Sequence, residues 1–225
     1  MPSQRQRPSL PHERPLSTLP PDAVQPLAEG AALLPAYGLG SADELLAQVG
    51  ELLREAPLRH MFTPGGQRMS VAMSNCGSAG WISDRRGYRY ESRDPQSGRP
   101  WPPMPPLMRG LARGAAALAG YAGFEPDACL INCYAPGTRL TLHQDRNERD
   151  LGAPVVSVSL GLPAIFLYGG LQRRDRVSRL PLFHGDVLVW GGPQRLVFHG
   201  VAPLADGGHP ATGRCRLNLT FRRAL

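Results

Sequence analysis

The sequence predicts an α+β protein that is mainly β, in which a double-sheet jelly roll follows N-terminal helices. Two segments, one after Ser41 and one at about 106–121, carry apolar residues at helical spacing. From residue 128 onward the chain instead shows short strands separated by turns, a pattern typical of a jelly roll. Such a barrel has an open mouth where side chains from different strands converge. The eight expected strands are 128–134, 138–145, 154–160, 164–168, 178–182, 185–190, 195–199 and 214–222.

Composition limits the class of protein. The 225 residues suit one domain with an extension. The formal net charge is +7, and all 25 basic residues are Arg. Arginine binds phosphates and stacks on flat rings, so the surplus permits a polyanionic partner such as nucleic acid. A preference for Arg codons combined with ordinary solubility explains the surplus equally well.

The cysteines and the apolar runs indicate a cellular compartment. Cys76, Cys129, Cys133 and Cys215 include no C-x-x-C pair, which argues against a zinc knuckle or a redox motif. No apolar run approaches about 18 residues, and the first residues lack the apolar core of a signal peptide. We therefore expect a cytoplasmic protein with reduced thiols and no membrane contact. No two-fold interface is visible, so a monomer is expected.

The elements before the barrel begin with a tail. Residues 1–36 are rich in Pro and Arg and show no apolar period, which is typical of a mostly disordered segment. Ser41 and Glu44 then form a capping-box pattern, in which the serine accepts from first-turn amides and the glutamate reaches back. Apolar residues at helical spacing follow, which predicts an amphipathic helix of about 13 residues.

An aromatic hairpin is expected next. A turn at 62–67 leads into a strand at 69–73, and residues 80–90 combine three aromatic residues, three arginines and a turn at Arg86-Gly87. Aromatic rings interleaved with arginines suit stacked bases and phosphates. The alternative places Trp81 in the core and the tyrosines at a sheet edge. The Pro-rich stretch 94–106 is expected to be a strand-free connector to the second helix.

The segment 138–145 contains a candidate metal site. On a strand, His143 and Asp145 lie two residues apart and therefore share one face. An imidazole and a carboxylate are two ligands of the facial triad that binds non-haem Fe(II) and leaves three positions open. His199 completes the triad if it arrives on a neighbouring strand. The alternative is a partly buried strand histidine bonded to a backbone carbonyl, and the short pattern alone does not separate the two.

The last expected strand adds a candidate anion site. Burying two guanidiniums on one strand face is costly unless an anion meets them. A dicarboxylate such as 2-oxoglutarate would do so, and its far carboxylate needs a bidentate cation. Asn132 and Tyr134 share a face of the strand 128–134 and can add hydrogen bonds. The face of the last strand carries Arg216, Asn218, Thr220 and Arg222.

These residues and several longer stretches resemble the AlkB family of Fe(II)/2-oxoglutarate-dependent DNA-repair dioxygenases. The resemblance covers most of the chain after the tail and is far more specific than the H-x-D pattern. The matching stretches are MSVAMSNC at 69–76, PDACLIN at 126–132, VSVSLGLP at 156–163, VWGG at 189–192 and NLTFR at 218–222.

The resemblance implies a double-stranded β-helix with N-terminal helices and a nucleotide-recognition lid. The chain would then divide into a tail (1–36), helices with the lid (37–127) and a dioxygenase core (128–225). The implied Fe(II) ligands are His143, Asp145 and His199. The implied 2-oxoglutarate contacts are Asn132, Tyr134, Asn218, Arg216 on the distal carboxylate and Arg222 on the iron-side carboxylate.

The resemblance also implies contacts with a flipped base. Trp81 and the ring of His143 would sandwich the base, and Asn147 would face it. Tyr88, Tyr90 and Arg173 would hold the strand near the lesion. The basic loop 171–179, which contains Arg173, could clamp phosphates or could be a solvated hairpin.

The implied activity is O2-dependent removal of methyl groups from 1-methyladenine and 3-methylcytosine, with release of succinate, CO2 and formaldehyde. Single-stranded DNA is the expected substrate because unpaired bases flip most easily. Double-stranded DNA and RNA stay open, as do a tRNA demethylase or a protein hydroxylase with the same cofactors. A non-catalytic cupin-like module that binds metal or nucleic acid is the alternative outside enzymes. Trp81, Tyr88 and the Arg-rich loop favour a nucleotide over a protein.

Two positions depart from the family pattern. Asn147 stands where the family has an Asp that faces the exocyclic amine of the base. Asn keeps an acceptor but loses the charge that favours a cationic lesion, so we expect weaker discrimination between cationic and neutral adducts. Gln67 stands where the family has a Tyr in the lid, which affects how the strand is gripped and leaves the chemistry intact.

Overall fold

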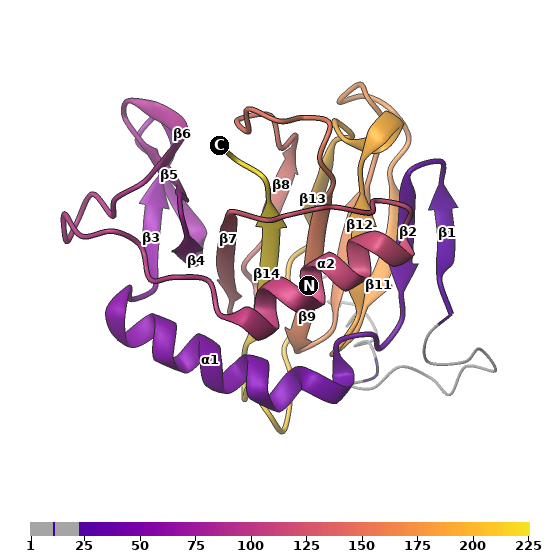
Figure 1. Cartoon of the computed structure of the whole chain (residues 1–225), viewed down its shortest axis with the longest axis horizontal. Coiled ribbons are helices and arrows are strands. Elements are labelled where there is room, and N and C mark those ends of the chain that lie inside the picture. The colour runs from indigo at the N-terminus through magenta and orange to yellow at the C-terminus, as the bar shows by residue number, and fades with distance from the viewer. Residues whose placement is uncertain (1–10, 12–22) are drawn as a thin grey trace, which may run out of the picture.

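The computed structural model describes residue 11 and residues 23–225, and it confirms a mainly β protein built on two sheets (Figure 1). The larger sheet has eight strands and the smaller has four. In order across the larger sheet these are β1 (Gln25–Ala28), β2 (Ala31–Leu34), β12 (Val187–Trp190), β9 (Val155–Gly161), β14 (Arg216–Arg222), β7 (Ala128–Tyr134), β4 (Arg68–Gly77) and β3 (Arg59–Phe62). The smaller sheet runs β11 (Ser178–Leu182), β10 (Ala164–Tyr168), β13 (His199–Val201) and β8 (Leu140–His143).

Each of the eight predicted barrel strands is present, although five differ in extent, and β8 and β13 differ most. β8 ends at His143, so Asp145 lies just beyond the strand. β13 begins at His199, four residues later than expected, because a turn at residues 195–196, directly after the 3₁₀ turn Gly192–Gln194, occupies the start of the predicted segment. The strands β7, β10 and β11 have the predicted bounds.

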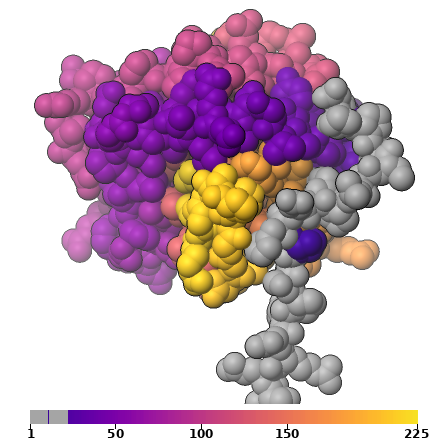
Figure 2. Space-filling view, turned by 90° about the horizontal axis from the view of Figure 1, so that it is seen from below, coloured from indigo at the N-terminus to yellow at the C-terminus, as the bar shows by residue number. Residues whose placement is uncertain are grey.

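Two helices cover the outer face of the larger sheet. They are α1 (Ala42–Glu55) and α2 (Pro106–Leu118), and their apolar faces share one core with the outward side chains of β7, β9, β12 and β14. Seen from below, the N-terminal part of the chain forms an indigo-to-purple band beside the yellow C-terminal residues (Figure 2). α2 ends earlier than predicted, because Gly120 adopts a φ of +91°, the left-handed conformation that commonly ends helices. Within the described residues, no helix is long and apolar enough to cross a membrane.

The predicted capping box before α1 is wrong. The Ser41 side chain makes no capping hydrogen bond, and its backbone (φ −112°, ψ 6°) is not in the extended region that a capping serine usually adopts. The reason is that Leu39–Ser41 forms a 3₁₀ turn that runs directly into the helix. Glu44 instead accepts a hydrogen bond from the Gln48 side chain, one turn further along.

The prediction of a disordered tail over 1–36 is also wrong at its C-terminal end. Residues 25–34 form a β-hairpin, β1–β2, which extends the larger sheet by pairing with β12. β2 is apolar and buried on both faces, so it lacks the alternation that marks a strand in a sequence. Residues 1–10 and 12–22 of the predicted tail lie outside the described residues.

We expect Leu33→Ala to lower the free energy of unfolding by about 2–4 kcal/mol, because the substitution leaves a cavity in a packed core. Leu33 is 2% exposed and lies opposite Leu188 of β12. Leu27→Ala on β1 is the matched control, since Leu27 is 37% exposed; it should cost under about 0.5 kcal/mol. Urea unfolding measures both. Equal effects would show that the hairpin adds no core to the sheet.

The inner faces of the two sheets enclose a second core and the candidate site. β14 alternates between the two environments: Leu217, Leu219 and Phe221 point toward the helices, and the polar residues between them point inward. A separate hairpin of β5 (Gly80–Asp84) and β6 (Gly87–Glu91) stands beside β3 and β4 at the edge of the molecule (Figure 1). The larger sheet runs across the expected boundary at 127/128, because β4 pairs with β7. Residues 37–127 and 128–225, predicted as separate segments, therefore share one sheet.

Candidate active site

A cavity of about 540 Å³ opens between the two sheets and the β5–β6 hairpin. The larger sheet, the smaller sheet and the hairpin all contribute to its lining. Of the thirteen predicted site residues, only Tyr90 does not line it. The twelve that do are Trp81, Tyr88, Asn132, Tyr134, His143, Asp145, Asn147, Arg173, His199, Arg216, Asn218 and Arg222.

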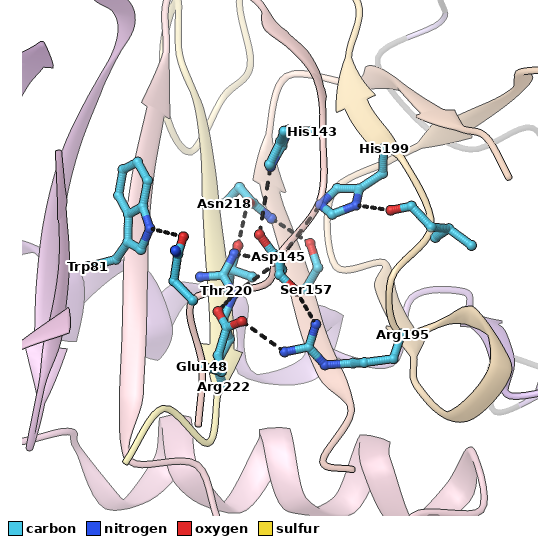
Figure 3. Close-up of polar contacts among 12 residues, drawn as sticks. Trp81, His143, Asp145, Glu148, Ser157, Arg195, His199, Asn218, Thr220 and Arg222 are labelled. Atoms are coloured by element: carbon cyan, nitrogen blue, oxygen red, sulfur yellow. Dashed lines mark hydrogen bonds and ion pairs between the residues drawn. The ribbon is translucent and has the colours of Figure 1, made fainter. Parts of the chain in front are cut away.

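Two histidines and a carboxylate converge in this cavity (Figure 3). One possible ligand atom from each of His143, Asp145 and His199 lies within 4.8 Å of the others. β13 pairs with β8 so that His199 is directly opposite His143, which confirms that the later histidine arrives on a neighbouring strand. The Nε2 atoms of the two rings are each 3.7 Å from an oxygen of Asp145. The spacing suits a single metal ion bound by the three side chains.

Backbone carbonyls fix the orientation of both rings. Nδ1 of His143 lies 2.9 Å from the Thr141 carbonyl, and Nδ1 of His199 lies 3.0 Å from that of Val197. Since a carbonyl only accepts, Nδ1 donates in each ring, which leaves Nε2 as the atom that can bind a metal. Burial, assisted by the neighbouring His143, lowers the pKa of His199 to about 4, so this ring is neutral at physiological pH. The carbonyl contact anticipated as the alternative for His143 is thus part of a geometry that also suits a metal ligand.

Asp145 is held as an anion. Burial alone would raise its pKa, but the charge of the Arg222 guanidinium holds the pKa well below its usual value. Arg222 donates from Nε and Nη2 to the same carboxylate oxygen, at 2.9 and 2.7 Å. An ionised carboxylate beside two imidazoles is the donor set that Fe(II) takes in facial triads.

The polar groups without partners gather around this cavity. Among the described residues, seven buried side-chain nitrogen or oxygen atoms lack a hydrogen-bond partner, and five of them belong to residues that line it. Buried polar groups are rarely left unpaired, so such a cluster indicates a polar ligand. The five atoms are Asn132 Oδ1, Trp190 Nε1, Arg216 Nε, Arg216 Nη1 and Arg222 Nη1.

Arg216 is the clearest anion-binding group. The residue is 1% exposed, and its Nη2 donates a hydrogen bond to Ser159 Oγ at 3.0 Å. The guanidinium carbon lies 5.0 Å from the centre of the Tyr134 ring, on the residue opposite it in β7. Nε and Nη1 are buried and unpartnered. A carboxylate fits these two donors in the forked arrangement that arginine prefers.

The two asparagines are fixed by strand neighbours. Asn218 donates from Nδ2 to Ser157 Oγ at 2.8 Å and to the Val158 carbonyl at 3.0 Å. Its Oδ1 accepts from Thr220 at 3.0 Å and from Asn132 at 3.3 Å. Asn132 therefore keeps its own Oδ1 free toward the cavity, whereas the groups of Asn218 are already in use.

The aromatic side chains of the hairpin face the cavity mouth. The rings of Trp81 and Tyr88 stack with their centres 5.7 Å apart and their planes 13° apart. Trp81 donates from Nε1 to Asn147 Oδ1 at 3.5 Å. Arg173 donates to the Leu142 carbonyl at 2.8 Å, which brings the basic loop against β8, and its guanidinium lies over the Phe198 ring. This placement favours a cavity role for Trp81 over the alternative of a core residue.

Several residues around the site carried no signal that we recognised in the sequence. Ser157 and Ser159 support Asn218 and Arg216, and their alternation within the buried strand β9 could have indicated an inward polar face. Glu148 and Arg195 form a buried ion pair with a 3.0 Å contact. They lie 47 residues apart, so no local pattern connects them.

Comparisons with known proteins agree with this geometry. The family model described as the 2OG-Fe(II) oxygenase superfamily matches residues 30–222. The chain is 55% identical to the α-ketoglutarate-dependent dioxygenase AlkB of Escherichia coli (strain K12), over 89% of this chain and 93% of that protein. It is 45% identical to the DNA N(6)-methyladenine demethylase ALKBH1C of Arabidopsis thaliana, over 44% of this chain and 24% of that protein.

Comparison with solved structures agrees with the family match. The solved structure of OsALKBH1 superposes with a TM-score of 0.79 at 30% identity, over 89% of this chain and all of the other.

Proposed function

Because the chain belongs to the 2OG-Fe(II) oxygenase superfamily, we propose that it oxidatively demethylates N-alkylated bases in nucleic acid, with single-stranded DNA as the preferred substrate. Membership makes the chain a dioxygenase that uses Fe(II), 2-oxoglutarate and O2. The substrate class follows from its AlkB relatives, one of which is named a DNA demethylase. The observation that carries the proposal is the stacked Trp81–Tyr88 pair at the mouth of a cavity that contains the metal-binding geometry.

The side chains present fit both cofactors. His143, Asp145 and His199 would hold the iron, because they offer two imidazoles and one carboxylate toward a common point. Arg216 would hold the distal carboxylate of 2-oxoglutarate with its two free donors, and Arg222 would meet the iron-side carboxylate with Nη1. When bound, these groups supply O2-dependent hydroxylation of a methyl carbon, with 2-oxoglutarate leaving as succinate and CO2.

The protein's own task is to bring the methyl group to this point and to keep it there. Trp81 and the His143 ring would sandwich a flipped base, and Asn147 would accept a hydrogen bond from its exocyclic amine. Tyr88 is half exposed beside Trp81, where it can hold the neighbouring nucleotide. After hydroxylation the hydroxymethyl adduct releases formaldehyde and restores the base. An unpaired base reaches such a cavity at the lowest cost, which favours single strands.

We further propose that the chain acts as a monomer in the cytoplasm. Its four cysteines are free, as expected in a reducing compartment. Within the chain, residues 37–127 would provide the helices and the nucleotide lid, and residues 128–225 the dioxygenase core. The aromatic hairpin lies in the first segment and the metal-binding geometry in the second, which supports this division of roles.

The test is a repair assay on a defined lesion. The protein is loaded with Fe(II) and 2-oxoglutarate without oxygen, and then receives O2 and a single-stranded oligonucleotide that carries 1-methyladenine. We expect the oligonucleotide to lose the mass of one methylene and succinate to accumulate. A matched RNA, a DNA duplex and an oligonucleotide with N6-methyladenine rank the substrates. Succinate without repair of any of them would move the proposal to a protein substrate. The absence of both succinate and repaired oligonucleotide would refute the proposed function.

We expect Asn147→Asp to raise the preference for cationic lesions. Asn147 lines the cavity and faces the Trp81 indole, so a carboxylate there would attract a positively charged base. The measurement is the ratio of 3-methylcytosine to ethenoadenine turnover, which should rise by about 5-fold for one added favourable charge contact. Arg146→Ala, one residue earlier, is a control for general effects on the loop. An unchanged ratio in Asn147→Asp would contradict the expectation.

A further inference from the structure

Glu148 joins the aromatic hairpin to the metal-binding geometry. Its side chain is 2% exposed, although it is neither a predicted metal ligand nor part of the cavity lining. Its Oε1 accepts a hydrogen bond from the Tyr90 hydroxyl at 2.6 Å and lies 3.3 Å from Arg222 Nε. Its Oε2 accepts from Arg195 Nη2 at 3.0 Å. One carboxylate therefore contacts the hairpin, β14 and the residue after η2 (Gly192–Gln194). Figure 3 shows its contact with Arg195.

Arg195 anchors the loop that carries both Asp145 and Glu148. Its side chain is 3% exposed, and it donates from Nη1 to the Asp145 carbonyl at 2.6 Å. It also donates from Nε to the Ala153 carbonyl at 2.9 Å. Together with the bond to Glu148, these contacts fix both ends of the loop after β8. The loop then has little freedom to reorient the Asp145 carboxylate.

The charges within this cluster are balanced. Two carboxylates, those of Asp145 and Glu148, meet two guanidiniums, those of Arg195 and Arg222. In a buried cluster of this kind, neutralising one member leaves its partners without compensation. Removing the charge of Glu148 would therefore free Arg222 to shift toward Asp145 and change how that carboxylate presents its oxygens.

Tyr90 connects the cluster to the base-facing ring. In the hairpin, Tyr90 of β6 lies directly opposite Trp81 of β5, so the two side chains share one face. Tyr90 does not line the cavity, and its hydroxyl is already bonded to Glu148. Burial raises the pKa of this hydroxyl well above its usual value, which keeps it a donor. Tyr90 therefore connects Glu148 to the hairpin that carries Trp81. The sequence instead predicted that Tyr90 contacts the nucleic-acid strand.

We propose that Glu148 is a positioning residue that latches the hairpin through Tyr90 and orients the metal-binding Asp145 through Arg222. The latch sets the position of Trp81 over the cavity and the orientation of the metal-binding carboxylate at the same time. This inference rests on the proposed function for the identity of the base and the metal, and it adds a coupling between their two sites. The proposal has two parts: a hairpin arm, in which Glu148 holds Tyr90, and a metal arm, in which Glu148 holds Arg222. The two make separate predictions, because Tyr90 belongs only to the hairpin arm.

The hairpin arm is tested with Tyr90→Phe, which removes only the hydroxyl. We expect the KM for the 1-methyladenine oligonucleotide to rise about 10-fold, the effect of losing one hydrogen bond to a charged group. Amide hydrogen exchange in residues 80–91 should become faster. The affinity for Mn(II), a probe that replaces Fe(II), should stay within 2-fold of wild type, as roughly expected when the second arm is intact. Tyr121→Phe is the matched control, since that hydroxyl bonds to the Gly30 carbonyl instead.

The metal arm is tested with Glu148→Gln, which keeps the shape and removes the charge. We expect Mn(II) affinity, measured by calorimetry with 2-oxoglutarate present, to fall about 10- to 100-fold, as is typical when a partner of a metal ligand is changed. Residues 80–91 should also exchange faster. Asp94→Asn is the control, because Asp94 is a buried acid that pairs with Arg59 outside the cluster.

Two results would overturn the latch. One is hydrogen exchange in residues 80–91 that matches wild type in Tyr90→Phe. The other is unchanged Mn(II) affinity in Glu148→Gln. Both readouts are independent of repair, so they test the latch even if wild-type protein fails to demethylate the oligonucleotide. Failure of repair alone would count against the proposed function.

Discussion

His143→Ala is expected to lower the rate of demethylation by about 1,000-fold or more, because two of three ligands cannot hold a catalytic metal in place. His143 is the best of the three positions for this test. Its side chain is 35% exposed, so its removal disturbs the core little. Asp145→Ala would remove the carboxylate that accepts two hydrogen bonds from the buried Arg222 guanidinium, at a cost of about 3–5 kcal/mol. Lost folding could then be mistaken for lost catalysis.

The measurement combines bound iron with product mass. Wild type and His143→Ala are loaded with Fe(II) and 2-oxoglutarate, freed of excess metal and assayed on the 1-methyladenine oligonucleotide. His60→Ala is the matched control, because His60 is also a strand histidine whose Nδ1 contacts a backbone carbonyl, that of Met69. If His143→Ala kept its iron and a tenth of the wild-type rate, the assignment of the three ligands would be wrong.

The inner faces of the central strands could be predicted from the sequence because these strands are long and alternate strictly. Because side chains alternate between the two faces of a strand, the sequence predicts that Arg216 and Arg222 share one face of β14. The register then brings Tyr134 of β7 opposite Arg216. The same reasoning placed His143 and Asp145 on one side, although the strand ends before Asp145. A side chain two residues along an extended chain keeps its direction even after the ladder hydrogen bonds stop.

The features that could not be predicted depend on partners far away in the chain. β2 is recognisable as a strand only beside β12, which lies about 150 residues later and supplies its hydrogen bonds. Tyr90 looks like a nucleotide contact in the sequence, because nothing near it indicates a bond to Glu148, 58 residues away. Arg195 is one of 25 arginines and has no motif around it. Local patterns report periodicity and turns, whereas buried ion pairs are set by the folded arrangement.

Arg216→Lys is expected to raise the KM for 2-oxoglutarate about 100-fold while leaving iron affinity in place, because lysine keeps the charge but not the two parallel donors. Arg216 is buried and has Nε and Nη1 free, the pair of donors that a carboxylate needs. Arg214→Lys is the matched control: it is two residues away, and its ion pair with Asp206 is exposed. Initial rates of succinate release at varied 2-oxoglutarate measure the effect.

A co-substrate that lacks the distal carboxylate shows which carboxylate Arg216 meets. 2-Oxovalerate has the same chain length as 2-oxoglutarate but lacks the distal carboxylate. If Arg216 binds that carboxylate, wild type should strongly prefer 2-oxoglutarate and Arg216→Lys should lose most of the preference, since the variant has lost only the contact that 2-oxovalerate never makes. If Arg216 instead meets the iron-side carboxylate, the substitution should weaken both co-substrates by the same factor. The distal contact would then need another cation, and Arg222, whose Nε and Nη2 are committed to Asp145, has only Nη1 left to offer.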